Sequence, residues 1–311
     1  MRWIWVCTSL VIVSADASVP PPKIDYHQHL LSPELATLID VPPIDADKLV
    51  ALLDSAGIRR ALVLSVAYSW SKPSRHVPND SVHVREENDW VASQVARYPD
   101  RLRGFCSVNP ARSYALAEIE RCAGNPMLHT GLKLHIGNSE LDYHNADDIA
   151  KLRQVFRTAN QKHMAIVIHM HASISQRLHY GRDEAQIFYD SVLSAAPDIP
   201  VQIAHLAGAG GYDSTTDGGL SVFVDAIARN DPRARNLWFD VTSVVRGTSP
   251  SSFQRIADRI RQLGLHRVLF GSDAAAGDNC RPRECWEDFR KLPLTDAEFT
   301  VIANNVAPYM R

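Results

Sequence analysis

The 311-residue chain is poor in cysteine, a residue that it uses only five times. Cys7 lies in an apolar stretch at the N-terminus, and the others are Cys106, Cys122, Cys280 and Cys285. Four cysteines in so long a chain do not make a disulfide scaffold, and none has the CxxC spacing of a cysteine-ligated zinc site. Cys280 and Cys285 are close enough in sequence to pair if the protein enters an oxidising compartment.

The sequence also lacks long runs of one charge. Its 33 Lys and Arg residues and 35 Asp and Glu residues leave a formal net charge of -2. Proteins that bind nucleic acid carry clustered basic residues, so this balance gives no electrostatic indication of nucleic-acid binding. Short internal repeats and low-complexity linkers are absent too. We therefore expect one domain that acts on a small molecule.

The chain has one apolar run with the features of a targeting signal, and it lies at the N-terminus. Arg2 precedes the apolar residues Trp3 to Val13, and Ala15-Asp16-Ala17 has the small-x-small pattern of a cleavage site. This pattern predicts a signal peptide over residues 1–17 and a mature chain over residues 18–311. The mature protein would be periplasmic or secreted, with no membrane attachment. A retained transmembrane helix is the alternative, although the run is shorter than the roughly 20 residues of a membrane span.

Beyond the N-terminal run, strand-like segments alternate with segments of helical periodicity. The strand-like segments cover residues 23–29, 61–66, 102–108, 131–135, 165–169, 201–205, 237–241 and 267–271. Several are unbroken apolar runs, as expected for a parallel sheet buried on both faces. Helical spacing covers residues 45–56, 82–98, 114–122, 147–162, 183–196, 220–229 and 251–263. The alternation predicts an α/β fold, a (β/α)8 TIM barrel, with a doubly wound open sheet as the alternative.

Residues of metal-ligand type follow the ends of several predicted strands. His27 and His29 lie on one face of the first strand because side chains alternate along a strand. The later ones are Lys133, His135, His169, His171, His205 and Asp273. In a barrel the carboxyl ends of all strands meet at one rim, where active sites form. The sequence therefore predicts one site built from residues that are far apart in the chain.

Neutral imidazoles and a carboxylate are ligands that hold zinc, manganese or a similar divalent ion. Three or four protein ligands leave a position for water, and the ion lowers the pKa of that water toward neutrality. The pattern therefore predicts a hydrolase that uses metal-bound hydroxide. Any one of these side chains taken singly has a hydrogen-bonded structural role as its alternative. Their recurrence at successive strand ends favours a common site.

Five motifs are similar to those of a known family. They are Ile-Asp-x-His-x-His at residues 24–29, Gly-Leu-Lys-Leu-His at 131–135, Val-Ile-His-Met-His at 167–171, Ala-His-Leu-Ala-Gly at 204–208 and Leu-Phe-Gly-Ser-Asp at 269–273. In this order they resemble the amidohydrolase superfamily over nearly the whole mature chain. The resemblance is strongest to the amidohydrolase-related group that includes aminocarboxymuconate-semialdehyde decarboxylase. That group holds both hydrolases and nonoxidative decarboxylases, so the motifs do not identify a substrate.

The resemblance also implies roles for individual residues. The implied metal ligands are His27, His29, His169 and Asp273. They would hold one divalent ion, with zinc favoured and manganese or another ion as alternatives. His205 would be the catalytic histidine. Asp273 would in addition take a proton from the metal-bound water.

Lys133 leaves two arrangements open. Binuclear members of the superfamily place a carboxylated lysine at this position, where it bridges two metals, and His205 would then be a ligand as well. The simpler arrangement has one metal and an unmodified Lys133 that attracts an anionic substrate, and we favour it. His135 and His171 have no role implied by the resemblance. His171 could contact substrate, but a surface position just beyond the strand is favoured.

The favoured function is a metal-dependent hydrolase of a C–N or C–O bond in a small amide, lactone or ester. The rival enzyme is a metal-dependent nonoxidative decarboxylase, a carboxy-lyase, of an aromatic or unsaturated acid. The rival outside enzymes is an exported barrel that binds metal or ligand without turnover. Loop residues that could contact a substrate are Tyr68, Trp70, Arg75, Arg177 and Arg246, since an arginine can hold a carboxylate with two hydrogen bonds. The sequence does not decide between a monomer and a homodimer.

Overall fold

The computed structural model describes residues 19–172, 178–274 and 281–311. Its eight strands form one sheet in sequence order with every neighbouring pair parallel. They are β1 (Ile24–Gln28), β2 (Arg60–Leu64), β3 (Leu102–Ser107), β4 (Gly131–His135), β5 (Ala165–His169), β6 (Val201–Ile203), β7 (Leu237–Asp240) and β8 (Val268–Leu269). The ring closes where the Tyr26 amide donates to Phe270 O at 2.9 Å. The predicted (β/α)8 barrel is confirmed, and the open sheet is excluded.

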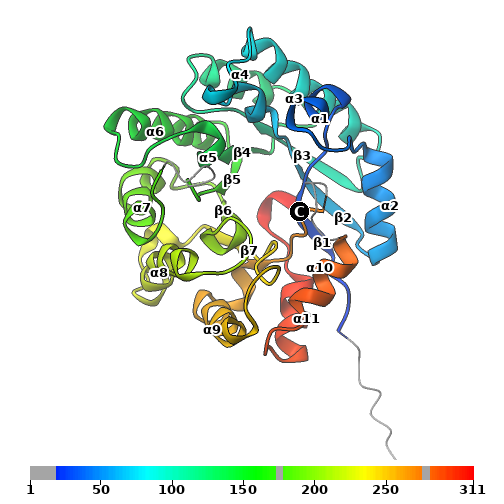
Figure 1. Ribbon diagram of the computed structural model, residues 1–311, viewed down its shortest axis with the longest axis vertical. Helices are drawn as coiled ribbons and strands as arrows, with labels where there is room; N and C mark the ends of the chain where they lie inside the picture. The colour runs from blue at the N-terminus through cyan, green and yellow to red at the C-terminus, as the bar shows by residue number, and fades with distance from the viewer. Residues whose placement is uncertain (1–18, 173–177, 275–280) are drawn as a thin grey trace, which may run out of the picture.

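Helices surround the ring of strands (Figure 1). They are α1 (Pro33–Ile39), α2 (Ala46–Ala56), α3 (Asp80–Ala96), α4 (Ala115–Ala123), α5 (Ile136–Ser139), α6 (Ala146–Gln161), α7 (Arg182–Ile187), α8 (Ser214–Ala228), α9 (Phe253–Leu263), α10 (Pro282–Phe289) and α11 (Asp296–Asn304). Short 3-10 turns join several of them, among them η1 (Ala67–Ser71) and η2 (Pro73–Arg75) after β2. No helix in the described ranges combines the length and the apolarity of a membrane-spanning segment.

Four of these helices, α1, α5, α10 and α11, were not predicted from the sequence. The stretch that holds α1 was expected to be a polar loop. Ser32 caps α1 by accepting a hydrogen bond from the Leu35 amide at 3.1 Å, and Pro33 suits the first helical position. The helices α1 and α5 have seven and four residues, so their apolar positions recur too few times to give a clear helical period.

Two predicted helices have different bounds in the structure. The helix expected over residues 183–196 is α-helical only as far as Ile187, and a π-helical turn, η3 (Phe188–Val192), follows. The helix expected from Leu220 begins at Ser214 instead. Asp213 caps it by accepting a hydrogen bond from the Thr216 amide at 2.8 Å. The first turns after this cap are polar, so they show no apolar periodicity from which a helix could be predicted.

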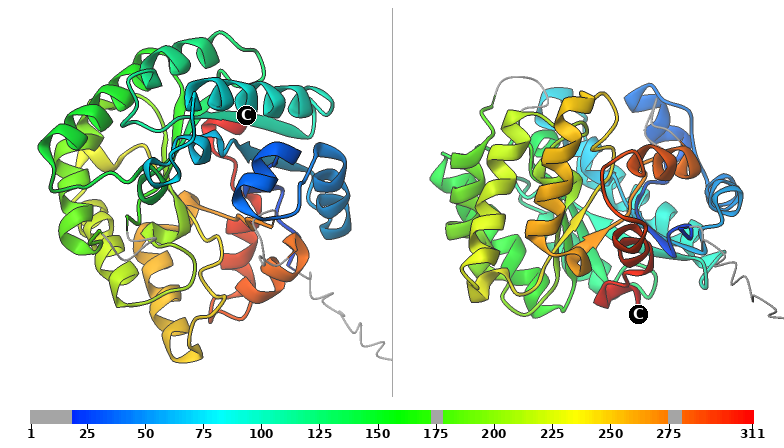
Figure 2. Two further views of the ribbon diagram at one scale, coloured as in Figure 1. Left: turned by 45° about the horizontal axis from the view of Figure 1, so that its top comes forward. Right: turned by 90° about the horizontal axis from the view of Figure 1, so that it is seen from below.

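Apolar side chains and the C-terminal tail fill the barrel below the strand ends. The buried residues in this cluster are Ile24, Tyr26, Leu62, Leu64, Phe105, Ala165, Val167, Ala204, Leu269, Ala307, Tyr309 and Met310. Phe105 occupies the space of a side chain at Gly131, where an added Cβ would lie 2.2 Å from the ring. Tyr26 anchors the tail because its hydroxyl accepts from the Ala307 amide at 2.8 Å. The C-terminus thus closes the lower end of the barrel in the right-hand view of Figure 2.

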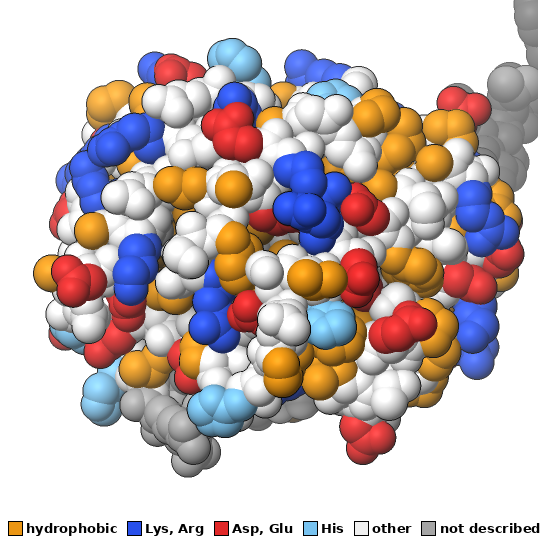
Figure 3. Space-filling model, turned by 90° about the horizontal axis from the view of Figure 1, so that it is seen from above, with side chains coloured by type: hydrophobic (Ala, Val, Ile, Leu, Met, Phe, Trp, Pro, Cys, Tyr) orange, Lys and Arg blue, Asp and Glu red, His pale blue; other side chains and the backbone are white. Residues whose placement is uncertain are grey.

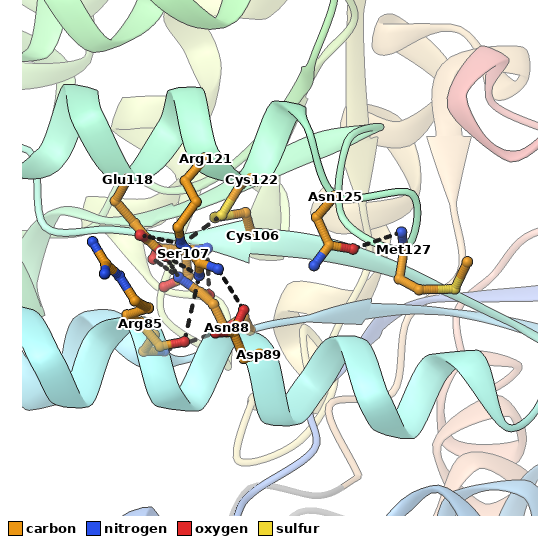
Figure 4. The surroundings of a disulfide bond; sticks show 12 residues. Arg85, Asn88, Asp89, Cys106, Ser107, Glu118, Arg121, Cys122, Asn125 and Met127 are labelled. Carbon is orange, nitrogen blue, oxygen red and sulfur yellow. Dashed lines mark hydrogen bonds and ion pairs between the residues drawn. A yellow bond between two sulfur atoms is a disulfide. The ribbon is translucent and has the colours of Figure 1, made fainter.

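A disulfide between Cys106 and Cys122 joins β3 to α4 (Figure 4). Both cysteines are buried, and their Cα atoms are 6.1 Å apart. A cross-link that closes a loop of this length is worth about 3 kcal/mol through the unfolded chain. The pairing of Cys280 with Cys285 stays a prediction, because Cys280 lies outside the described residues. The expected signal peptide also lies outside them.

Candidate active site

The carboxyl ends of the strands surround a cavity of about 380 Å³. The strand-end residues that line it are His27, His29, Lys133, His135, His169, His205 and Asp273. The rest of its wall is formed by Leu31, Ile39, Val41, Val66, Tyr68, Ser69, Arg75, Asn138 and Ala209. The structure therefore brings together all but one of the strand-end residues that the sequence singled out. The exception is His171, whose ring packs on Tyr180 with centroids 4.6 Å apart, outside the cavity lining.

The loop residues proposed from the sequence divide into three groups. Tyr68 and Arg75 line the cavity, and both come from the 3-10 turns after β2. Trp70 lines a separate cavity together with residues of α3, and Arg246 lines a small cavity near α10. Arg177 lies outside the described residues.

The hydrogen bonds of three histidines fix which ring nitrogen faces the cavity. The Nδ1 atom of His29 lies 2.6 Å from Leu64 O, and that of His205 lies 3.0 Å from Thr242 O. A carbonyl oxygen can only accept, so both Nδ1 atoms carry the proton. The Nδ1 atom of His27 likewise donates to Asp240 Oδ2 at 3.2 Å. All three Nε2 atoms therefore keep a lone pair, which is the form that binds a metal.

These donor atoms converge. One ligand atom from each of His27, His205 and Asp273 lies within 4.8 Å of the other two. The Nε2 atom of His29 is 3.3 Å from Asp273 Oδ1. The Nε2 atom of His169 is buried without a hydrogen-bond partner among the described residues, and its ring centroid is 4.9 Å from that of His205. Nitrogen and carboxylate donors in this arrangement fit a divalent cation of the zinc or manganese type.

Burial keeps the histidines in the neutral form that a metal requires. It lowers the pKa of His29 to about 3, and the Lys133 charge adds to the effect. Burial, followed by neighbouring charges, also lowers the pKa values of His27, His135 and His169. Lys133 itself is 1% exposed, and burial lowers its pKa to about 8. Its Nζ lies 3.3 Å from His27 Nε2, so a buried cation lies beside the cluster of ligands.

Asp240 at the end of β7 is a site residue that the sequence analysis missed. It is fully buried, and it accepts from the His205 amide at 2.9 Å and the Thr242 amide at 3.2 Å besides His27. Gln202 Nε2 donates to it at 2.6 Å. Burial alone would raise the pKa of Asp240, but His27, His205 and the hydrogen bonds hold it well below its usual range. The signal in the sequence was an acidic residue at the end of the seventh strand, between the sixth and eighth strands, which already carried candidate ligands.

A hydrogen-bonded chain continues from Asp240 to the bottom of the barrel. Gln202 Oε1 accepts from the Tyr309 hydroxyl of the C-terminal tail, and Gln202 is fully buried. The Gln202 amide is thereby held with its NH₂ group toward Asp240. The packed tail thus helps to orient the carboxylate that in turn orients His27.

Asp240→Asn should weaken metal binding by roughly ten- to a hundredfold, as loss of a carboxylate behind a histidine ligand generally does. The asparagine oxygen can still accept the two backbone amides, so its NH₂ group would face His27 Nδ1 and favour the wrong tautomer. Competition with a chelating dye measures the affinity. Asp258→Asn, an exposed surface control on α9, should bind as the unaltered protein does. Unchanged affinity in Asp240→Asn would contradict this role.

Asp25, within the first motif, ties two strand ends together rather than facing the cavity. It accepts from the His27 amide at 3.1 Å, from the Ser272 amide at 3.0 Å and from the Ser272 hydroxyl at 2.6 Å. Burial raises its pKa to about 6. The adjacent Asp273 amide donates to His27 O at 2.7 Å. These bonds fix the histidine motif on β1 relative to Asp273 after β8.

Gly271 is needed for this close approach. A Cβ added there would lie 2.2 Å from Thr242 Oγ1 and 2.7 Å from His27 Cβ. Any side chain would therefore push β8 away from the first and seventh strands. The glycine of the Leu-Phe-Gly-Ser-Asp motif is therefore required for steric reasons.

The fold and the place of the cavity, at the carboxyl ends of the strands, are those of a (β/α)8 enzyme. The amidohydrolase family model matches residues 24–305, and the chain belongs to this family. The resemblance seen in the motifs is thus confirmed. A comparison with curated protein sequences returned no match.

Solved structures with the same fold cover nearly the whole chain. A 5-carboxyvanillate decarboxylase from Sphingomonas paucimobilis has a TM-score of 0.60 at 16% identity, over 91% of this chain and 97% of that one. A dihydroxybenzoic acid decarboxylase from Polaromonas, with bound manganese and the inhibitor 2-nitroresorcinol, has a TM-score of 0.56 at 18% identity, over 92% and 95%. A probable 2-pyrone-4,6-dicarboxylic acid hydrolase from Acinetobacter baumannii has a TM-score of 0.61 at 16% identity, over 90% and 96%. At these identities the likeness establishes the fold alone.

Proposed function

We propose that the protein is a metal-dependent nonoxidative decarboxylase of an aromatic or unsaturated carboxylic acid. The observation that carries the proposal is the composition of the cavity. It joins a cluster of neutral histidines and a carboxylate to two cations, Lys133 and Arg75, and to an apolar wall that includes Leu31, Ile39 and Val41. Such a wall suits a planar unsaturated ring, and the cations suit its carboxylate. The decarboxylases among the similar structures support the same choice over the hydrolase favoured from sequence.

In this proposal the ligands remain those implied by the family motifs, namely His27, His29, His169 and Asp273. The ion, with zinc or manganese as the candidates, would supply positive charge to polarise the oxygen atoms of the bound acid. Arg75, whose Nη1 donates to Ser69 O at 2.8 Å, would hold the carboxylate from the side of η1. Arg75 takes part in no ion pair within the described ranges, so its charge is available to a substrate.

His205 has the geometry for proton transfer. Its Nδ1–H donates to Thr242 O, which leaves Nε2 free to pick up a proton from a substrate hydroxyl or from solvent. In decarboxylation the bond between the ring carbon and the carboxylate breaks, carbon dioxide leaves, and that carbon takes a proton in its place. Delivery from His205 Nε2 would balance the reaction. Burial lowers the pKa of His205, so the ring returns to its neutral form after each transfer.

Hydrolysis of a C–O bond is the second candidate. Asp273 Oδ1 lies 3.3 Å from His29 Nε2 beside the donor cluster, where a carboxylate could take the proton of an attacking water. The pyrone dicarboxylic acid hydrolase among the similar structures supports this candidate. Hydrolysis of a lactone would also use a planar substrate that carries carboxylates.

A panel assay separates the candidates. Metal-loaded protein is incubated in ¹⁸O-water with hydroxybenzoates, unsaturated dicarboxylic acids, lactones and amides, and with Asp273→Ala protein as the control. Release of carbon dioxide without ¹⁸O in the organic product supports decarboxylation. Ring opening or cleavage with ¹⁸O in the product would support hydrolysis instead. Saturable binding of an acid without any product would favour the non-catalytic binding barrel.

Arg75→Gln should raise KM for a carboxylate substrate by about ten- to a hundredfold, because one bidentate charge-assisted interaction is lost. The value of kcat should change less, because the carboxylate loses its negative charge as carbon dioxide forms, so Arg75 binds the ground state more strongly than the transition state. Steady-state kinetics with the best acid of the panel measure both constants. Arg246→Gln is the matched control, because Arg246 lines a different cavity. Equal KM values for Arg75→Gln and Arg246→Gln would contradict the assignment.

We also propose that the chain is exported, as its N-terminal pattern predicts, and acts on a small molecule without nucleic acid or membrane as a partner. Export fits the buried disulfide between Cys106 and Cys122, since such bonds persist in oxidising compartments. Fractionation of cells that express the full chain tests the location. A homodimer remains a proposal, and light scattering of the purified protein tests it.

A further inference from the structure

A second cavity lies at the opposite end of the barrel, where the strands begin. Its volume is about 650 Å³, within the range of roughly 300–1,000 Å³ typical of small-ligand sites. The basic residues of its wall are Lys23, Arg59, Arg60, Arg103 and Arg311, and the only acidic one is Asp100. The remaining wall is formed by Ile24, Pro99 and Val306. The cavity is thus strongly basic in a chain whose net charge is -2.

The fold itself gathers these cations. Lys23 precedes β1, Arg60 opens β2, and Arg103 is the second residue of β3. The parallel register places Arg60 opposite Ile24, and the Arg60 amide donates to Lys23 O at 3.3 Å. The tail adds Arg311, because Arg60 Nη1 donates to Met310 O at 2.6 Å and holds the last turn against the strand. The lower end of the barrel in Figure 2 carries this C-terminal turn.

Asp100, the acidic residue of the wall, offsets only part of the charge of these five cations. Within residues 19–172, 178–274 and 281–311, none of them takes part in an ion pair. Neighbouring arginines behave differently, since Arg97 pairs with Asp47 at 2.6 Å and Arg101 pairs with Asp54 at 2.5 Å. On the face of the molecule drawn in Figure 3, acidic and basic side chains are mixed with one another. The cavity thus gathers five cations that have no ion-pair partner among the described residues.

The crowding of like charges has an electrostatic consequence. Burial, together with the charge of Arg60, lowers the pKa of Arg103. Guanidinium groups that repel one another in a partly buried cavity are stabilised when an anion lies between them. Arginine binds phosphate oxygens with two parallel hydrogen bonds, and several arginines on one wall suit an anion with more than one charge.

We propose that this basic cavity binds a small phosphate-type oxyanion with at least two negative charges, such as a diphosphate or a phosphate ester. The site is separate from the histidine cavity, and its occupancy does not depend on the proposed decarboxylase activity. Arg59, Arg60 and Arg103 supply the main contacts. The bound anion would also fasten the C-terminal turn, because Arg60 already holds Met310.

Calorimetric titration with inorganic pyrophosphate at constant ionic strength tests the site. Pyrophosphate also chelates metals, so the decisive titrations use the Asp273→Ala protein, in which the proposed metal centre is disrupted. Saturable binding of one equivalent is expected, with the same affinity as in the unaltered chain after its metal has been removed with a chelator. Loss of binding in Asp273→Ala would place the anion in the histidine cavity and overturn the proposal.

Arg59→Gln and Arg103→Gln, each made in the Asp273→Ala protein, should weaken pyrophosphate binding by about tenfold or more. Arg59 is exposed, so its replacement is expected to leave the fold intact, and circular dichroism checks this. Arg97→Gln is the matched control, since Arg97 lies on the nearby surface but does not line the cavity, and it should bind as its parent does. Equal affinity in Arg59→Gln, Arg103→Gln and Arg97→Gln would contradict the proposed site. Displacement of bound pyrophosphate by chloride alone would also contradict the proposed site.

Discussion

Asp273→Ala is expected to remove the bound metal and to lower turnover by roughly a thousandfold or more, since loss of several kcal/mol of transition-state stabilisation has this effect. The carboxylate reaches into the donor cluster, 3.3 Å from His29 Nε2 and within 4.8 Å of donors from His27 and His205. No other carboxylate lines the cavity within the described residues. The remaining ligands would all be neutral imidazoles, which hold a divalent ion less tightly.

The fold should survive this substitution, because the apolar core lies below the site and does not include Asp273. Elemental analysis gives the metal content, circular dichroism gives the fold, and steady-state assays give turnover. Asp258→Ala on the exposed face of α9 controls for removal of a carboxylate and should keep both metal and activity. An Asp273→Ala protein with full metal content and full turnover would remove the proposed site.

His205→Asn is expected to keep the metal while turnover falls by about a hundredfold or more, as loss of a positioned proton-transfer group generally does. Asparagine is chosen because His205 has φ of 54°, a left-handed backbone conformation that asparagine tolerates better than alanine. The substitution then removes the imidazole without adding backbone strain. Metal analysis and turnover measured on the same preparation give the result.

His163→Asn is a matched control for this experiment. His163 also has a left-handed backbone, with φ of 55°, but it is exposed and outside the histidine cavity. Its replacement should change neither metal content nor turnover. Loss of one metal equivalent in His205→Asn would make His205 a ligand and would contradict its assignment as the proton-transfer residue. Because a ligand atom of His205 lies within 4.8 Å of those of His27 and Asp273, the experiment distinguishes a metal ligand from a proton-transfer residue.

The barrel and the place of its site followed from the sequence because both depend on local patterns. Unbroken apolar runs such as Ala165–His169 predict strands of a parallel sheet, and each ends at a residue whose position on the rim is then fixed by the fold. His27, His169 and Asp273 could therefore be placed in one cavity without any knowledge of their distances. The loop residues Tyr68 and Arg75 were named, but the sequence could not distinguish them from Arg246.

The features that sequence analysis missed depend on contacts between distant parts of the chain. Asp240 was read only as part of a strand, since nothing local reveals that His27, Gln202 and two backbone amides converge on it. The predicted strand through His205 ends at Ile203 in the structure. The chain turns there because Asp240 accepts the His205 amide and the next residues adopt left-handed conformations. The packing of Tyr309 and Met310 into the lower end of the barrel likewise depends on contacts with distant residues. A short apolar tail has no periodic pattern from which this packing could be predicted.

The number of metal ions per chain, measured together with the native mass of Lys133, tests the central claim most directly. Lys133 Nζ lies 3.3 Å from His27 Nε2, so a carboxylated form of this lysine would stand next to the ligands. The account predicts about one divalent ion per chain, an unmodified Lys133, and turnover that is lost on chelation and restored by adding metal back. Full turnover in metal-free protein, or two tightly bound ions with a mass increase on Lys133, would contradict it.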